Sequence, residues 1–456
     1  MTVTWYNGST QLATETYTIT GSTFFAEKNV TGYNKVVATF DAMTRASRFL
    51  KIYSISDGIS REFYKEEIIS LDILECMNQN NIDLSANEVR LKLLPANTLG
   101  VVFQRTLPMK IYRKRYGNWL LWGKYYITDV ETNRKENTYT IKLGDAISLL
   151  QYQTFLGGQY SNTNVSTIIN SIFSGSGFSV TFNSAVSGLL GYERITGYLP
   201  MMNKREALRQ VLLASGYSID ASRSGSLVIR NNTAIKSGTS VKKMSLNTKD
   251  TYYDDEVFDY KKNRANIVTR YEYKLKTLNA TASSSQVLYS GTLNGTTTIY
   301  FSSPVYNLSI SNGTIDESNI NYATITGTGS TVTLSGKTYE ASEKIYSRDN
   351  PNAIATDLPR TEVQDATIYC TRYSTGSAGS SYYTSHSEDF YKFANENVST
   401  ELIADYKSSD YRYHPIINDG VKISSAMSSY YRVTELEYNL LKPTIKYKVL
   451  LEDANE

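Results

Sequence analysis

Few residues in this chain have the types and spacing that catalysis or metal binding requires. The only imidazoles are His386, in a Gly/Ser-rich stretch typical of a solvated loop, and His414, next to Pro415; neither has a neighbour at metal-ligand spacing. The acidic run from Tyr253 to Glu256 lacks the glycine and the spaced oxygen ligands of a calcium loop, which favours an exposed charged turn over a Ca²⁺ site. The sequence has no GxSxG, no HExxH and no Gly-rich phosphate loop followed by a helix. We therefore predict no catalytic residue, no metal and no cofactor.

Two cysteines and one basic run are the other side chains of chemical interest. Cys76 and Cys370 are too few for a disulfide framework or a zinc cluster and lack an activating neighbour, so we predict buried thiols. In the run Arg113-Lys114-Arg115, strand alternation places Arg113 and Arg115 on one face. A solvated face is the favoured interpretation, and a surface facing an acidic partner is the alternative.

Composition narrows the class of protein. The 456 residues are enough for about three or four domains of ~100–200 residues each. A formal net charge of +3 is too balanced for a nucleic-acid binder. The N-terminal MTVTWYNGST lacks the features of a signal peptide, and no apolar run approaches the ~18 residues that span a bilayer, so we expect a soluble cytoplasmic protein with no membrane contact. The 38 Tyr against 8 Pro favour strands and half-buried contact surfaces.

One hairpin pattern occurs twice. Tyr125 to Asp145, YYITDVETNRKENTYTIKLGD, alternates apolar and polar residues on both sides of a polar tip, as an antiparallel hairpin with one buried face does. Tyr430 to Asp453, YYRVTELEYNLLKPTIKYKVLLED, repeats the order of residue types. Upstream, Pro-Met-Lys-Ile at 108–111 corresponds to Gly-Val-Lys-Ile at 420–423. Either strand composition produced these matches by chance, or one small β-barrel was built twice.

The elements before residue 150 predict the first barrel, and we place the first domain at 1–150. A short helix at 146–150 closes it, after a turn at Gly117-Asn118. The predicted strands are Val3–Tyr6, Thr16–Ile19, Lys35–Phe40, Ile68–Cys76, Val89–Leu94, Met109–Arg115 and Trp119–Tyr126.

After residue 150 the spacing of the apolar residues changes to that of helices, which predicts a small α+β domain at 151–235. Val165–Phe173 has helical apolar spacing. The best helix is Asn203–Gly216, with Asn203 as N-cap, Glu206 at the capping-box position and Gly216 at the left-handed C-terminal position. A strand at 178–182 and a hairpin of 217–220 with 226–230 complete the domain.

The rest of the chain is predicted to form the second barrel, at 236–278 and 400–456, with an inserted domain at 279–399. Ala265–Tyr273 is the clearest strand before the insertion. The insertion is Ser/Thr/Gly-rich, and its β-branched and aromatic pairs favour a small β domain over disorder. Its predicted elements are strands at 297–301, 322–325 and 331–334, a turn at Ser335-Gly336, a flexible loop at 371–387 and a helix at 388–407. The predicted fold is thus mainly β with a small α+β domain and two similar tube-protein-like barrels.

Several segments together carry a resemblance to a known family. They are WGKYYITDVETNRKENTYTIKLGDAISLL, the helix at 165–173, GYLPMMNKREALRQVLLASGYSIDASRSGSLVIR and PIINDGVKISS with YYRVTELEYN. In their order the chain resembles the baseplate hub proteins of contractile phage tails and of phage-tail-like bacteriocins. The likeness covers roughly residues 100–275 and 410–453, and neither the first 30 residues nor the segment 280–380 shares it. Hub-like proteins of long non-contractile tails look similar over the same stretch, so the tail type stays open.

The resemblance implies a structural and non-enzymatic role. In that family each subunit has two similar barrels, and a trimer presents six barrels in a ring that continues the six-fold tail tube and meets the three-fold spike. The implied partners are the tube, spike, tape measure and baseplate or wedge proteins. The implied location is the virion or a tail-like particle assembled in the host bacterial cytoplasm. Lumen-facing positions are expected to be polar or charged so that DNA passes without sequence-specific binding. The expected ring contacts are the hairpins Tyr125–Leu143 and Tyr431–Val449.

Two other classes of function stay open. Exposed rings such as Tyr382-Tyr383 and Tyr430-Tyr431 would suit a carbohydrate-binding tail protein, although core packing is the favoured interpretation. A wall-cleaving enzyme requires an acidic pair that only the fold can bring together.

Overall fold

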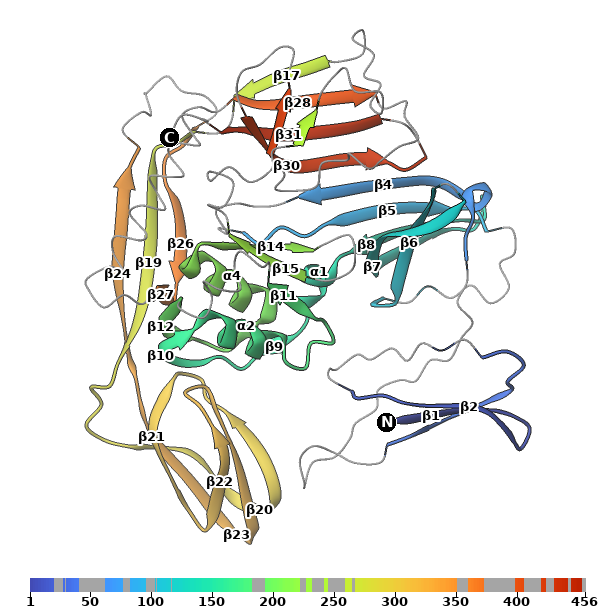
Figure 1. The fold of residues 1–456 in the computed structure, drawn as a ribbon. Coiled ribbons are helices and arrows are strands. Elements are labelled where there is room, and N and C mark those ends of the chain that lie inside the picture. The colour runs from blue at the N-terminus through green and yellow to red at the C-terminus, as the bar shows by residue number, and fades with distance from the viewer. Residues whose placement is uncertain are drawn as a thin grey trace.

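The protein, seen here as a computed structural model, is mainly β with a small α+β part, which confirms the predicted fold class (Figure 1). No helix among the described residues is both long and apolar enough to cross a membrane. The predicted domain limits stay predictions. The structure describes residues 1–19, 28, 30–40, 62–76, 83–95, 103, 105–115, 117–182, 193–221, 227–231, 242–244, 259–264, 267–350, 360–372, 398–405, 420–423, 430–441 and 444–452.

An 11-stranded sheet, called the main sheet below, dominates the fold. Segments far apart in sequence lie side by side in it, so that β30 neighbours β4 (Figure 1). Its strands in spatial order are β17 (Asp259–Arg264), β28 (Val398–Asp405), β31 (Thr444–Glu452), β30 (Tyr430–Asn439), β4 (Ile68–Cys76), β5 (Glu88–Leu93), β8 (Thr138–Gly144), β7 (Asn118–Asn133) and β6 (Pro108–Arg115). β29 (Gly420–Ile423) also pairs with β30, and β16 (Lys242–Met244) pairs with β29.

Alternation buries one face of this sheet. In β5 the residues Val89, Leu91 and Leu93 are buried while Arg90 points the other way and is exposed. The same phase in β4, β8 and β7 builds a continuous apolar cluster that also takes in Leu436 and Tyr438 of β30. Its fully or nearly buried members are Leu71, Ile73, Val89, Leu91, Leu93, Tyr125, Ile127, Ile141, Leu143, Leu436 and Tyr438.

The α+β part lies next to β4 and β5 of the main sheet (Figure 1). Its principal helix, α4 (Lys204–Ser215), begins as predicted: the side chain of Asn203 accepts a hydrogen bond from the Glu206 amide at 2.8 Å. The helix ends at Gly216 with φ of 76°, a conformation that glycine adopts without strain. The other elements are α1 (Ala146–Leu150), β9 (Thr154–Phe155), β10 (Gly158–Asn164), α2 (Val165–Phe173), β11 (Val180–Phe182), β12 (Arg194–Leu199), β13 (Met202–Asn203), β14 (Tyr217–Ala221) and β15 (Leu227–Asn231).

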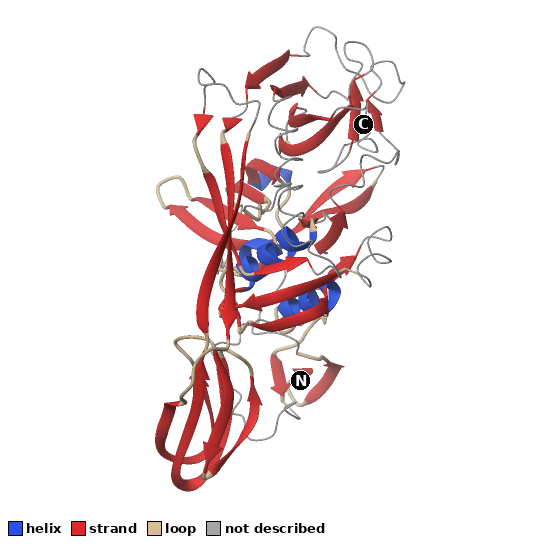
Figure 2. Ribbon diagram, turned by 90° about the vertical axis from the view of Figure 1, so that its left-hand side faces the viewer, coloured by secondary structure: helices blue, strands red, loops and turns tan. Residues whose placement is uncertain are grey.

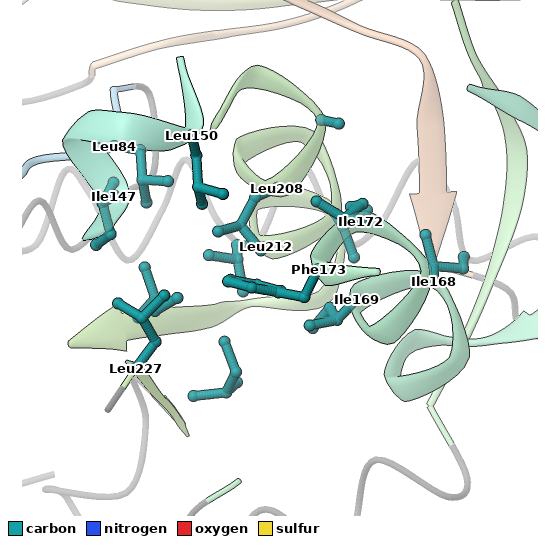
Figure 3. Packing of buried hydrophobic residues seen from close by; sticks show 14 of the residues in the cluster. Leu84, Ile147, Leu150, Ile168, Ile169, Ile172, Phe173, Leu208, Leu212 and Leu227 are labelled. Atoms are coloured by element: carbon teal, nitrogen blue, oxygen red, sulfur yellow. The ribbon is translucent and has the colours of Figure 1, made fainter. Parts of the chain in front are cut away.

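The three helices pack on a common core. Ile172 and Phe173 of α2 lie toward Leu208 and Leu212 of α4, as Figure 3 shows, and Ile168 and Ile169 belong to the same buried cluster. Ile147 and Leu150 of α1 enter the same cluster, so the helix that ends the first hairpin also anchors the α+β part. The predicted helices at 146–150 and 165–173 are confirmed to the residue.

A buried carboxyl joins the main sheet to this core. Asp145 caps α1, accepting hydrogen bonds from the amides of Asn87 at 2.7 Å and Ser148 at 3.1 Å. The Asn87 side chain accepts from the Cys76 amide and donates to the Ala221 carbonyl, at 3.1 and 3.2 Å. Burial raises the pKa of Asp145 to about 6, although the two amide bonds act in the opposite direction. The ends of β4, β5, β8 and β14 therefore meet around one carboxyl group.

Three small sheets complete the fold. The N-terminal sheet is β2 (Thr10–Thr16), β1 (Thr2–Asn7) and β3 (Lys35–Thr39). A long ribbon of β24 (Glu340–Asp349), β19 (Arg270–Asn279) and β26 (Gln364–Ile368) leads to the inserted sheet of β20 (Gln286–Tyr300), β23 (Tyr322–Thr338), β21 (Val305–Ser311) and β22 (Gly313–Ser318) (Figures 1 and 2). Shorter strands are β18 (Ile267–Val268), β25 (Arg360–Thr361) and β27 (Cys370–Arg372), and the chain has a 3₁₀ turn at Lys65–Glu67.

Some predicted strands are wrong because strand partners decide where strands end. The strand at Thr16–Ile19 is instead Thr10–Thr16, which ends where its partner β1 begins, at the pair Thr2 and Thr16. The strand at Ala265–Tyr273 is interrupted at Thr269, because β18 pairs with β25 whereas β19 pairs with β24 and β26.

Two other predictions fail through tertiary packing. Ser335-Gly336 is not a turn but lies within β23, which joins the predicted strands 322–325 and 331–334; a Cβ on Gly336 would lie 2.6 Å from Val305 Cγ1, so close packing explains the glycine. The helix predicted at 388–407 is wrong over Val398–Asp405, which is β28 and is held between β17 and β31. His386, His414, the acidic run 253–256 and the predicted loop from residue 373 lie outside the described residues.

The raised pKa of Asp145 predicts a pH dependence of stability. Between the ordinary carboxyl pKa of about 4 and the folded value of about 6, the folded state keeps a proton that the unfolded chain has lost, so this group's contribution is present in acid and is lost as pH rises through that window. Asp145→Asn removes the titration. We expect the free energy of unfolding of the wild type, relative to the variant, to fall by about 2 kcal/mol from pH 4 to pH 7. Urea titrations of both proteins measure it, and a constant difference would refute the prediction.

Candidate functional site

Ten of the eleven strands of the main sheet form two units with the same order of five strands, and β16 lies outside them, paired with β29. The first unit is β4, β5, β8, β7 and β6. The second is β17, β28, β31, β30 and β29. Each unit is built on a central hairpin, β7–β8 or β30–β31. The strand before the hairpin in the chain, β6 or β29, pairs with the first strand of the hairpin.

Both hairpins carry the same irregularity at the same place. In the first, the register shifts between Ile127 and Asp129, so Thr128 bulges and Asp129 pairs with Lys142. In the second, it shifts between Val433 and Glu435, so Thr434 bulges and Glu435 pairs with Lys448. A bulge, the acid after it and the lysine opposite thus recur together.

The tips of the hairpins also agree. The side chain of Asn133 accepts a hydrogen bond from the Lys135 amide at 3.1 Å, and that of Asn439 accepts from the Leu441 amide at 2.8 Å. The flanking strands β6 and β29 pair in equivalent registers as well, because Met109 pairs with Tyr125 and Val421 pairs with Tyr431. The registers therefore match Tyr125 with Tyr431, and they favour duplication over chance as the origin of the repeated sequence.

The two units are joined edge to edge within one chain. The end of β30 pairs antiparallel with the end of β4, from Glu435 opposite Cys76 to Asn439 opposite Asp72. The Tyr438 hydroxyl donates to the buried Glu75 carboxylate at 2.7 Å and accepts from Trp122 Nε1 at 2.7 Å. The Trp122 and Tyr438 rings meet edge to face at 5.7 Å. The junction is thus fixed by backbone pairing and by a buried polar network that reaches both units.

The other face of the first unit is charged and mixed in sign. Cross-strand neighbours run from Asp72 through Arg90 and Lys142 to Asp129. Lys142 Nζ lies 3.6 Å from Asp129 and 3.5 Å from Glu131. The Val130 amide, with Arg105 and Lys142, holds the pKa of Asp129 below its ordinary value. These pairs are solvent-exposed, so their contribution to stability is small and their main effect is on the potential of this face.

Exposed apolar side chains lie on both faces of the hairpin β6–β7, with Tyr112, Trp119 and Leu121 on one face and Leu120 on the other. Trp119 is 55% exposed and its neighbours Leu120 and Leu121 are 48% and 40% exposed. Tyr112 on the facing strand is 47% exposed. Apolar side chains grouped in this way on one hairpin are typical of a contact surface.

The residues singled out from sequence are placed as follows. Arg113 does not form a freely solvated face: its guanidinium lies over the Trp122 ring at 5.7 Å. Cys370 is buried, as predicted, and Cys76 is partly buried; burial raises their thiol pKa values to about 12 and about 11. Among the described residues no group of three or more His, Cys, Asp or Glu is arranged to hold a metal.

Sequence reasoning missed the residues of the junction. The pattern of β4 buries Leu71, Ile73 and Glu75, so a carboxylate stands in the apolar phase of an otherwise regular strand. A charged residue in that phase is the signal that could have indicated a buried partner. Its partner, Tyr438, lies hundreds of residues away, where no local pattern points to it.

No protein-family model and no curated protein matches the chain. Solved structures with a similar fold include a prophage tail protein from Listeria monocytogenes, at 8% identity and a TM-score of 0.41, covering 85% of this chain and 95% of that one. The 43 kDa tail protein of prophage MuSo2 from Shewanella oneidensis is similar at 10% identity and 0.44, covering 85% and 94%. A tail protein from Neisseria meningitidis is similar at 9% and 0.43, covering 85% and 93%. These TM-scores lie below 0.5, so the function is argued from the chain's own strands.

The junction network predicts the effect of Tyr438→Phe. The variant removes the hydroxyl that Glu75 accepts from and that Trp122 donates to, so it should destabilise the β30–β4 pairing by about 1–3 kcal/mol. Hydrogen–deuterium exchange of peptides from β4 and β30 should then be about tenfold to a hundredfold faster. Tyr112→Phe, at an exposed ring, is the control and should leave exchange unchanged. Unchanged exchange in Tyr438→Phe would mean that the network does not hold the junction.

Proposed function

We propose that the chain is a structural hub of a phage tail or tail-like particle, which forms a trimeric ring and adapts a six-fold tail tube to a three-fold spike. The observation that carries this proposal is the edge-to-edge pairing of two equivalent five-stranded units within one chain. A chain with two such units presents six of them as a trimer. It therefore has three-fold symmetry by its subunits and near six-fold symmetry by its units.

The chemistry of the sheet supports a role built on surfaces. In the first unit one face forms the apolar core, which leaves its mixed-charge face available to line a lumen. Alternating acids and bases, such as Asp72 beside Arg90 and Lys142 beside Asp129, provide no continuous positive surface to retain phosphates. DNA could therefore pass such a face without being held.

The exposed β6–β7 hairpin supports an assembly role in the same way. On one face Tyr112, Trp119 and Leu121 have the exposure expected of a surface that another protein covers. In the proposed particle the partners are the tube, spike, tape measure and baseplate or wedge proteins, and the location is the tail baseplate. The proposed role is non-enzymatic, and it needs no cofactor or metal.

The proposal predicts the mass and shape of the protein in solution. Light scattering coupled to size exclusion should give about three times the 51.2 kDa of the chain. Negative-stain images should show a ring with a central hole and six similar lobes. A protein that forms no trimer at any concentration reached would refute the hub. If that protein also binds or cleaves a cell-wall polysaccharide, a binding or enzymatic tail protein would be favoured.

A further inference from the structure

The two strand edges that pair at the junction, those of β30 and β4, each have a counterpart in the other unit. The counterpart of the β30 edge is on β7. β30 is paired on its outer edge twice: β29 takes Tyr430–Arg432 and β4 takes Glu435–Asn439. β7 is paired there by β6 as far as Tyr126, and loop amides and carbonyls at 106–107 bond Ile127. From Asp129 to Asn133, no described strand pairs with that edge of β7.

The strand that corresponds to β4 in the second unit is also unpaired on one edge. β4 lies outside β5 in the first unit, and β17 lies outside β28 in the second. Among the described strands, β17 pairs with β28 and with no other. The edge of β17 that corresponds to the β30-facing edge of β4 therefore has no partner among the strands that the structure describes.

We propose, on the basis of the hub function above, that β7 of one copy pairs antiparallel with β17 of the next copy, repeating between subunits the β30–β4 junction found within each. The partner is a second copy of this chain. Three such contacts, alternating with three internal junctions, close a ring of six units without an exposed strand edge at this level.

The internal junction fixes the register of the proposed one. The shared bulge matches Glu435–Asn439 with Asp129–Asn133. Lys142 pairs with Arg90, and its counterpart Lys448 pairs with Glu401, so Arg90 corresponds to Glu401. Arg90 pairs in turn with Asp72 of β4, and Glu401 pairs with Lys261 of β17, so Asp72 corresponds to Lys261. Because Asn439 pairs with Asp72, the proposed pairs are Asn133 with Lys261, Thr132 with Lys262, Glu131 with Asn263 and Val130 with Arg264.

The charges of the two strands agree with this register, which follows from the backbone pairing alone. The open part of β7, DVETN, carries Asp129 and Glu131 and no base. β17, DYKKNR, carries Lys261, Lys262 and Arg264 against a single acid. Asp129 and Glu131 are 40% and 62% exposed, so both acids remain accessible to a neighbour. Glu131 becomes the diagonal cross-strand neighbour of Lys261, a distance that long side chains span.

Paired cysteines test the register directly. Residues opposite each other in an antiparallel pair have Cα atoms about 4.5–5.5 Å apart, within the range of a disulfide. We would make Thr132→Cys with Lys262→Cys, and Glu131→Cys with Asn263→Cys, because adjacent pairs alternate between the two hydrogen-bonding types. After mild oxidation of the full chain, at least one pair should give covalent trimers on a non-reducing gel. The matched control, Thr132→Cys with Asp259→Cys, is three residues out of register and should not, and neither should the single variants.

Charge reversal tests the same contact without oxidation. Glu131→Lys should raise the dissociation constant of the trimer at least about tenfold, and adding Lys261→Glu should restore it. Glu136→Lys makes the same charge change at the exposed hairpin tip, outside the proposed register, and should have little effect.

The outcomes separate this proposal from the hub function. A trimer by light scattering that neither cross-links through these pairs nor responds to Glu131→Lys would overturn the β7–β17 contact and leave the hub standing. A chain that forms no trimer at any concentration reached would refute both.

Discussion

The fold depends on how the edges of one sheet are paired. Backbone amides and carbonyls at a strand edge need partners, and a flat exposed edge pairs with whatever strand it meets. In this chain β30 satisfies that requirement by adding β4, a strand from the opposite end of the sequence. The pairing buries Glu75 and Tyr438, whose hydrogen bond has good geometry and a third member in Trp122. Because a carboxylate buried without partners would be costly, this network makes the register of the junction specific in a way that backbone pairing alone does not.

The helical part depends on the same sheet. α1 begins at Asp145, directly after β8, and its cap ties it to Asn87 at the start of β5. α4 then lies between two cores: Leu208 and Leu212 pack with α1 and α2, whereas Leu213 packs against Tyr273 and Ile368 of the ribbon. Gln210 fixes that second contact, because its side chain donates to the Thr367 carbonyl at 2.9 Å and accepts from the Tyr369 amide at 3.2 Å. Helix, ribbon and sheet are therefore positioned by one another, and the edge strands of the sheet keep a fixed relation to the rest.

Local patterns predicted the elements well and their partners poorly. The caps Asn203 and Gly216 and the apolar phase of α2 act within a few residues, so the helices were found from sequence. The two hairpins were recognised because their period and their polar tips are local too. The predictions that fail depend on residues far away in the sequence. The residues of β28 alone favour a helix, and its strand conformation depends on pairing with β17 and β31. Gly336 predicts a turn, but a glycine is needed there because Val305 packs against it. The β30–β4 junction is of the same kind, since only Glu75, a charge in an apolar phase, indicates it.

The outer strands of the inserted sheet can vary in sequence without changing the strand edges of the main sheet. It contacts the α+β part through Asn321, whose buried amide donates to the carbonyls of Leu156 and Leu199 at 2.8 and 3.1 Å, and through Asn319, which donates to the Gly157 carbonyl at 3.1 Å. These bonds use backbone acceptors, so they constrain the site where the insertion attaches and not its outer strands. Its own core is small and separate, built around Ala323, Ile325, Val332 and Leu334. A module with its own core and a few fixed attachment bonds can change its exposed surface independently. The inserted sheet is therefore the part of the described chain whose exposed surface the rest of the fold constrains least.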